Sequence, residues 1–227
     1  MSAFVSPYGV AVPRSIRCCE YRIETPMLKN DHVLRELAEA ELGAAAQLVA
    51  RGMHDNPINL RVFGEHDIER RGRVLARFFG PVLHGLHRRG TIVGAFRSGS
   101  MVGVCGMAPP GHCQPTALEK LTVLPALGFG NAASTPRLLC WTSEWSRRDP
   151  AEPHWHLGPV AVDSILQGRG IGSAMLADFC GRMDRGAASS YLETDKPENV
   201  RFYERFGFAV RAQADVLGVR NWFMQRN

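Results

Sequence analysis

The stretch that decides the fold begins HWHLGPVAV (residues 154–162) and continues through the turn QGRGIG (residues 167–172). The first segment is predicted to be a strand, and a helix is expected to run from the turn to about Arg185. The helix is indicated by residues at the spacings of one helical face: Gly172, Leu176, Phe179 and Met183. A second strand, residues 190–194, follows, and two strands joined by such a helix are expected to be parallel. The stretch therefore predicts a right-handed βαβ unit.

Three glycines, Gly168, Gly170 and Gly172, lie where the strand gives way to the helix. The first amides of a helix have no partner within it, and the helix dipole adds partial positive charge there. Because glycine has no side chain, a phosphate or pyrophosphate can approach this backbone closely. Gln167 and Arg169 are expected to flank the anion, although an ordinary surface charge explains Arg169 equally well. The predicted amide donors are Gly168, Arg169, Gly170, Ile171, Gly172 and Ser173.

The spacing of the glycines separates three kinds of phosphate-binding motif. A P-loop requires a Gly-Lys-Ser/Thr that is not found here, and the dinucleotide fingerprint Gly-x-Gly-x-x-Gly fits poorly. The observed Gln-x-x-Gly-x-Gly, after a strand ending in Val-Ala-Val-Asp, resembles motif A of the GCN5-related N-acetyltransferases (GNAT). The run NVRFYERFGF (residues 199–208) resembles the second signature of that family. Residues 152–155 and 192–194 are similar to its puromycin N-acetyltransferase branch, and the resemblance covers the C-terminal third of the chain well.

The resemblance implies an α/β (α+β) fold, with a mixed, mostly antiparallel sheet, a splayed parallel central pair and flanking helices. Gly158-Pro159 interrupts the first strand of that pair, and glycine or proline inside a strand indicates a bulge. In the family, a bulge here separates the parallel strands and admits the pantetheine arm of acetyl-CoA. The resemblance therefore places the thioester near residues 157–160. The backbone expected to contact the cofactor is that of Leu157, Val160, Ala161 and Val162.

The reaction implied is direct transfer of an acetyl group from acetyl-CoA to the primary amine of a small molecule, with both substrates bound at once. The leaving thiolate must gain a proton, and a phenol can donate one. We expect Tyr203 to be this donor, because the family commonly uses a tyrosine here. A tyrosine that only packs under the cofactor is the alternative. Asn199 precedes Tyr203 by one helical turn, so it is predicted to face the cofactor arm beside Phe202.

The base that removes the amine proton has two candidates of similar merit, His156 and Glu193. The imidazole of His156 suits proton relay near neutral pH, and Glu193 lies on the paired strand. Asp195 is a weaker candidate, and attack without a base, with water carrying the proton, stays open. His154 and His156 share one strand face, but no further metal ligand is evident nearby, so no metal is expected.

The 227 residues are expected to form one acetyltransferase domain, residues 30–227, after an N-terminal arm, residues 1–29, in which residues 18–25 are a candidate strand. A helix is predicted to begin at Asn30-Asp31 and to end near Pro57. The remaining predicted elements are helices over residues 67–89, 118–124 and 136–147, a hairpin over 91–107, and strands over 209–216 and 222–225.

Two segments of the poorly matched first part each have a pocket wall as one interpretation. By the resemblance, residues 56–63 are a candidate wall of the acceptor pocket, and an ordinary loop after a helix is the alternative. Trp141 and Trp145 lie one helical turn apart and are interpreted as core residues, with a shared pocket wall as the alternative.

Composition limits the other function classes. The net charge of +5, from 27 Lys and Arg against 22 Asp and Glu, suits a polyanionic cofactor and is too small and scattered to predict nucleic-acid binding. The six cysteines include no C-x-x-C pair and are interpreted as reduced thiols, which predicts a cytoplasmic protein. No leader and no apolar run long enough for a membrane span is evident, and a homodimer is left open.

Two further functions are compatible with the same motifs. One is transfer to a protein or peptide amine, or transfer of a different acyl group from its CoA thioester. The other is a sensor that binds acyl-CoA without catalysis, and the presence of Tyr203 and Asn199 argues against it. Nucleotide binding at the glycine turn is the least favoured reading.

Overall fold

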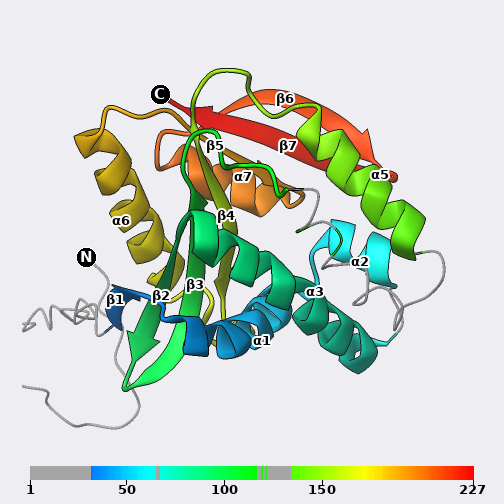
Figure 1. Ribbon diagram of the computed structural model, residues 1–227, viewed down its shortest axis with the longest axis horizontal. Coiled ribbons are helices and arrows are strands. Elements are labelled where there is room, and N and C mark those ends of the chain that lie inside the picture. The colour runs from blue at the N-terminus through cyan, green and yellow to red at the C-terminus, as the bar shows by residue number, and fades with distance from the viewer. Residues whose placement is uncertain (1–31, 65–66, 117–118, 120, 122–133) are drawn as a thin grey trace, which may run out of the picture.

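The computed structural model of the protein describes residues 32–64, 67–116, 119, 121 and 134–227. Within these residues, seven strands form one sheet in the order β1-β2-β3-β4-β5-β7-β6 (Figure 1). Neighbouring strands are antiparallel except for β4 (Trp155–Val162) and β5 (Ser190–Thr194), which are parallel. The predicted α/β (α+β) class, with a mixed and mostly antiparallel sheet, is therefore confirmed.

The N-terminal edge of the sheet differs from the prediction. Residues 32–36 form strand β1 (His32–Glu36), which pairs with β2 (Thr91–Arg97), so the helix predicted to begin at Asn30-Asp31 is wrong over this segment. The apolar spacing of this segment suggested a helix, but hydrogen bonding to β2 makes it a strand. Helix α1 (Leu42–Gly52) begins only after a single 3-10 turn, η1 (Glu39–Glu41). The expected arm and its candidate strand lie outside the described residues.

Most other elements agree with the prediction. The hairpin is β2 with β3 (Ser100–Ala108), and α3 (Ile68–Arg89) begins where the Asp67 side chain accepts a hydrogen bond from the Arg70 amide at 2.8 Å. Helix α5 (Ser134–Ser146) covers most of the helix expected over 136–147. The helix expected over 118–124 lies almost wholly outside the described residues.

Two segments were misassigned. Residues 57–63 form a helix, α2 (Pro57–Phe63), where no helix was predicted. At the C-terminus, β6 (Ala209–Val216) and β7 (Val219–Arg226) pair in a hairpin, so β7 begins before the predicted Trp222. Gly218 has a φ of 79°, which makes Leu217-Gly218 the turn. Asn221 is buried in the strand opposite Ala214.

The sheet is covered on both faces. Helices α1 and α3 pack on one face, and α6 (Ile171–Arg185) with α7 (Pro197–Glu204) packs on the other. Alternate residues of β2 enter opposite cores, Ile92 with α1 and α3 and Val93 with α6, as the two-residue period of a strand requires. Helix α5 lies beside α2 and β6 (Figure 1).

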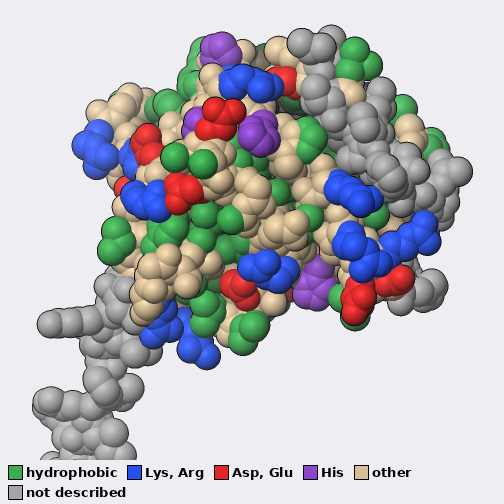
Figure 2. Space-filling view, turned by 60° about the horizontal axis from the view of Figure 1, so that its bottom comes forward, with side chains coloured by type: hydrophobic (Ala, Val, Ile, Leu, Met, Phe, Trp, Pro, Cys, Tyr) green, Lys and Arg blue, Asp and Glu red, His purple; other side chains and the backbone are tan. Residues whose placement is uncertain are grey.

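Figure 2 shows basic and acidic side chains interspersed over the face it presents, without a continuous basic stripe. Several arginines are paired with carboxylates, as Arg182 is with Glu36 and Asp178. In the described part of the chain, no helix is both long and apolar enough to cross a bilayer.

Candidate active site

The parallel strands β4 and β5 are paired only where they begin. Their register is Trp155 with Ser190 and His156 with Tyr191, and no later residue of β4 is paired with β5. On the other side of β4, the pairing with β3 shifts register between Cys105 and Met107, opposite Gly158-Pro159. The predicted bulge and splay are thus present. They leave the β5-facing edge of residues 158–162 without a strand partner among the described residues.

The glycine turn places the N-terminus of α6 beside this gap. Gly168 and Gly170 have φ values of 75° and 83°, in the left-handed region that favours glycine, and Gly170 is the N-cap of α6. The first intrahelical hydrogen bond runs from the Ala174 amide to the Gly170 carbonyl at 3.0 Å. The amides of Ile171, Gly172 and Ser173 therefore have no partner within the helix and are available to an anion.

The two side chains expected beside the anion are placed differently. Gln167 Nε2 lies 3.3 Å from both the Gly52 carbonyl and the Val162 carbonyl, so this side chain ties the turn to α1 and to the end of β4. Gln167 still lines the cavity described below, whereas Arg169 does not. The structure therefore brings the predicted residues of the turn together except for Arg169.

Helix α7 places its three predicted residues on the cavity wall: Asn199, Phe202 and Tyr203. Asn199 Nδ2 donates to Thr194 Oγ1 at 3.2 Å, which fixes the side chain against the end of β5. The Tyr203 side chain is buried, and its ring packs edge-on against Phe202 at 5.3 Å between centroids. Burial raises the pKa of Tyr203, so its hydroxyl stays protonated and remains a hydrogen-bond donor.

The two rival bases form one pair. His156 Nε2 lies 3.0 Å from Glu193 Oε2, and the Glu193 side chain is 3% exposed. On the other side of the ring, Asp149 Oδ1 lies 3.9 Å from His156 Nδ1. Burial alone lowers the pKa of His156, but the charges of Glu193 and Asp149 outweigh it and raise that pKa to about 10. At neutral pH the ring is therefore an imidazolium between two carboxylates.

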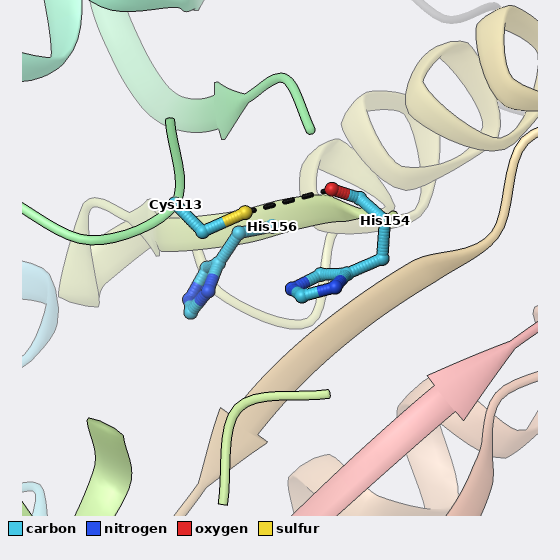
Figure 3. A group of neighbouring side chains, drawn as sticks. All are labelled: Cys113, His154 and His156. Atoms are coloured by element: carbon cyan, nitrogen blue, oxygen red, sulfur yellow. Dashed lines mark hydrogen bonds between the residues drawn. The ribbon is translucent and has the colours of Figure 1, made fainter. Parts of the chain in front are cut away.

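A second histidine extends this network (Figure 3). His154 Nδ1 lies 2.8 Å from the Glu152 carbonyl, and its Nε2 lies 3.1 Å from Asp149 Oδ1. The Cys113 thiol donates to the His154 carbonyl at 3.5 Å, and possible ligand atoms of Cys113, His154 and His156 lie within 4.8 Å of one another. Both nitrogens of His154 lie within hydrogen-bonding distance of protein oxygens, the Glu152 carbonyl and Asp149, so the ring is engaged on both sides. The arrangement suits a hydrogen-bonded network, and a site without metal stays our prediction.

Asp195, the weaker base candidate, is engaged elsewhere. Its Oδ2 accepts from the Ile58 amide at 2.7 Å, and its Oδ1 accepts from Asn56 Nδ2 at 3.1 Å. Both oxygens therefore hold the start of α2 against the end of β5. Burial raises the pKa of Asp195, but the geometry assigns the side chain to fixing α2, the candidate acceptor wall.

One cavity of about 1160 Å³ connects these features. It runs from the glycine turn along residues 157–162 of β4, past Tyr203, to the His156–Glu193 pair. Beyond the pair it is bounded by the end of α1 and by α2, α3 and α5. A cavity of this size with one wall of free backbone amides and one buried ion pair can hold two substrates at once.

Comparison with known proteins agrees with this geometry. The family model described as "Acetyltransferase (GNAT) family" matches residues 63–208. The chain belongs to the GNAT acetyltransferase family. It is thus an N-acetyltransferase, and its acyl donor is acetyl-CoA. The predicted family, activity and cofactor are confirmed at this level, while the likeness to the puromycin branch stays a prediction.

Solved structures share the fold at low sequence identity. A histone acetyltransferase HPA2 and related acetyltransferase from Corynebacterium glutamicum is 22% identical, with a TM-score of 0.65 over 86% of this chain and 96% of that one. An agmatine N-acetyltransferase is 13% identical, with a TM-score of 0.57 over 86% and 98%. A PaiA N-acetyltransferase from Thermoplasma acidophilum, in complex with coenzyme A, is 12% identical, with a TM-score of 0.52 over 86% and 98%.

Sequence reasoning missed one member of the network. Asp149 does not line the cavity, but it contacts both histidines from behind, where its Oδ2 accepts from Gln114 Nε2 at 2.9 Å. It follows α5 in an ordinary Arg-Arg-Asp-Pro segment and belongs to no motif. No local signal marks it, because its role depends on how α5 packs across the sheet.

Proposed function

We propose that the protein acetylates the primary amine of a small molecule by direct transfer from acetyl-CoA within a ternary complex. The observation that carries the proposal is the single cavity that joins the glycine turn to the His156–Glu193 pair. Simultaneous binding at its two ends brings the amine to the thioester without a covalent enzyme intermediate.

The residues at one end of the cavity fit coenzyme A. The amides of Ile171, Gly172 and Ser173 suit its diphosphate, and the unpaired edge of β4 offers backbone groups to the amides of its pantetheine arm. Bound there, acetyl-CoA supplies the thioester whose acetyl group is transferred. Asn199, held by Thr194, is placed to contact the same arm.

The ion pair handles the proton of the amine. An ammonium ion has no lone pair, so the substrate must lose a proton before it attacks. His156 is already protonated at neutral pH, because its pKa is raised to about 10, so it cannot accept this proton. Glu193 therefore serves as the base, and His156 orients its carboxylate. Glu193 lines the cavity, so its carboxylate is placed to contact the amine of the acceptor.

Tyr203 donates to the departing sulfur. Its hydroxyl stays protonated because burial raises its pKa, and its ring is fixed by Phe202 and Phe208. A fixed donor stabilises negative charge as it develops on the sulfur, at little reorganisation cost.

A panel of amines, assayed with acetyl-CoA by release of free thiol, tests the proposal. Turnover with small primary amines supports it. Turnover of lysine-containing or N-terminal peptides alone would replace the small-molecule acceptor with a protein. Tight binding of acetyl-CoA with no turnover of any amine would favour an acyl-CoA sensor instead. The cytoplasmic location and the oligomeric state are separate predictions that this assay does not address.

A further inference from the structure

The acceptor end of the cavity has an aromatic wall, formed by Phe78 of α3 and by Trp141 and Trp145 of α5. Their rings are in series, since the centroids of Phe78 and Trp141 are 6.2 Å apart and those of Trp141 and Trp145 are 5.0 Å apart. Trp141 is also buried in the core, so the predicted core role and its alternative, a pocket wall, both hold for this residue. Such a surface favours a flat or bulky apolar group on the ligand.

The aromatic wall is held rigidly. Trp145 Nε1 donates to Asn221 Oδ1 at 3.0 Å, and Asn221 is itself fully buried and donates through Nδ2 to the Val219 carbonyl at 2.8 Å. The indole is therefore anchored near the start of β7 by a buried hydrogen bond. A rigid wall loses little conformational entropy when a ligand binds against it.

The wall and the ion pair are close along the same elements. Four residues after Trp145, Asp149 faces His156. Between them, Arg148 lies over the ring of Phe223 at 5.3 Å, and Phe223 is the cross-strand partner of Glu193. The end of α5 is therefore packed beside Glu193. Glu193 and Trp145 both line the cavity, so one ligand can contact both residues.

The charges of this end of the cavity limit the rest of the ligand. Its arginines are paired with carboxylates of the protein, Arg89 with Glu119 at 2.9 Å and Arg147 with Glu144. Among the described residues of this end, no unpaired cation faces a ligand carboxylate.

We propose that the acceptor is a primary arylalkylamine: one amine, a short linker and an aromatic ring, without a free carboxylate. This inference rests on the proposed function and narrows its substrate class. The amine lies at Glu193, and the ring packs against the aromatic wall. An α-amino acid is disfavoured because its carboxylate is desolvated without a partner, and a polyamine because it has no ring to pack against the aromatic wall.

The test compares kcat/KM at saturating acetyl-CoA for four amines: 2-phenylethylamine, phenylalanine amide, phenylalanine and spermidine. The first two are expected to exceed spermidine by about 100-fold or more, and phenylalanine amide to exceed phenylalanine by about tenfold or more. Equal or better turnover of spermidine or phenylalanine overturns the inference and leaves the proposed function standing. If no amine is acetylated, both fail.

A variant ties the preference to the wall. Trp145→Leu is expected to raise KM for 2-phenylethylamine about tenfold with little change in kcat, because it removes binding of the ring and not chemistry. Trp222→Leu is the matched control, since Trp222 is also half-buried but does not line the cavity, and it should leave KM unchanged. Trp145→Phe keeps an aromatic surface should the leucine variant unfold, and it should retain most of the preference. An unchanged KM in folded Trp145→Leu overturns the inference.

Discussion

Replacing Glu193 by glutamine is expected to lower the pKa of His156 sharply. The Glu193 carboxylate is the strongest of the charges that raise this pKa to about 10, at 3.0 Å from Nε2. An opposite charge at such a distance shifts a pKa by about 1–3 units, so glutamine should bring the value to about 7–9. Asp149, at 3.9 Å, and burial remain to set the new value.

The effect is read by NMR titration of the imidazole resonances, with His156→Asn used to assign the signal. Glu204→Gln is a matched control, because it removes a carboxylate from the exposed side of α7 and should leave His156 unchanged. A wild-type His156 that titrates near 6.5, or one that does not respond to Glu193→Gln, would refute the electrostatic reasoning.

The same shift predicts how stability depends on pH. The folded pKa of His156 lies above its ordinary value of 6.5, so the stabilisation is complete below that pH and is lost as pH rises through about 10. One proton at most is involved, so the free energy of unfolding should fall by up to about 1.4 kcal/mol per pH unit in this window. Urea unfolding at several pH values should show this slope in the wild type and a slope confined to lower pH in Glu193→Gln.

Three further outcomes are expected. Tyr203→Phe should slow the chemical step by about 100-fold with little change in acetyl-CoA affinity, and an unchanged single-turnover rate would remove Tyr203 from proton donation. Because His156 is charged across neutral pH and Glu193 takes the proton from a bound ammonium ion, the wild-type kcat/KM should stay level across neutral pH and show no limb near pH 6.5; such a limb, abolished in His156→Asn, would make the histidine the base. Asp195→Ala leaves the buried Ile58 amide unpaired and should lower the free energy of unfolding by about 1–3 kcal/mol, with α2 losing hydrogen-exchange protection first; uniform protection across α2 and α1 would contradict this.

The sequence predicted the C-terminal half well because its signals are local. The glycine spacing, the apolar face of α6 and the strand at 190–194 each depend on neighbours a few residues away. The resemblance then grouped Tyr203, Asn199 and the edge of β4 into one site, and these residues do line one cavity.

The features that the sequence did not predict depend on distant partners. Strand β1 is set by pairing with β2, since its own apolar spacing suggests a helix. The start of α2 is fixed by Asp195, which is 137 residues away from Ile58. Asp149 joins the histidines only because the segment after α5 lies beside β5, where the Tyr191 hydroxyl donates to the Arg148 carbonyl at 3.1 Å. Local propensity carries no information about such contacts.

The central claim is that the amides after Val162 bind the diphosphate of coenzyme A while the gap between β4 and β5 receives its arm. Gly172→Ala tests it without disturbing the fold, because an added Cβ would lie 3.6 Å from Phe202 and 3.7 Å from Val162, which are ordinary contacts. Both neighbours line the cavity, so the methyl group would narrow the passage that the arm must enter. Gly181→Ala, on the same helix and outside the cavity, is the matched control.

The decisive measurement is calorimetric titration of coenzyme A into the wild type and these two variants. The wild type and Gly181→Ala should bind one equivalent with equal affinity, and Gly172→Ala should bind about tenfold more weakly or worse. Folded wild-type protein with no affinity for coenzyme A or acetyl-CoA, or Gly172→Ala binding as tightly as Gly181→Ala, would contradict the assignment of this site.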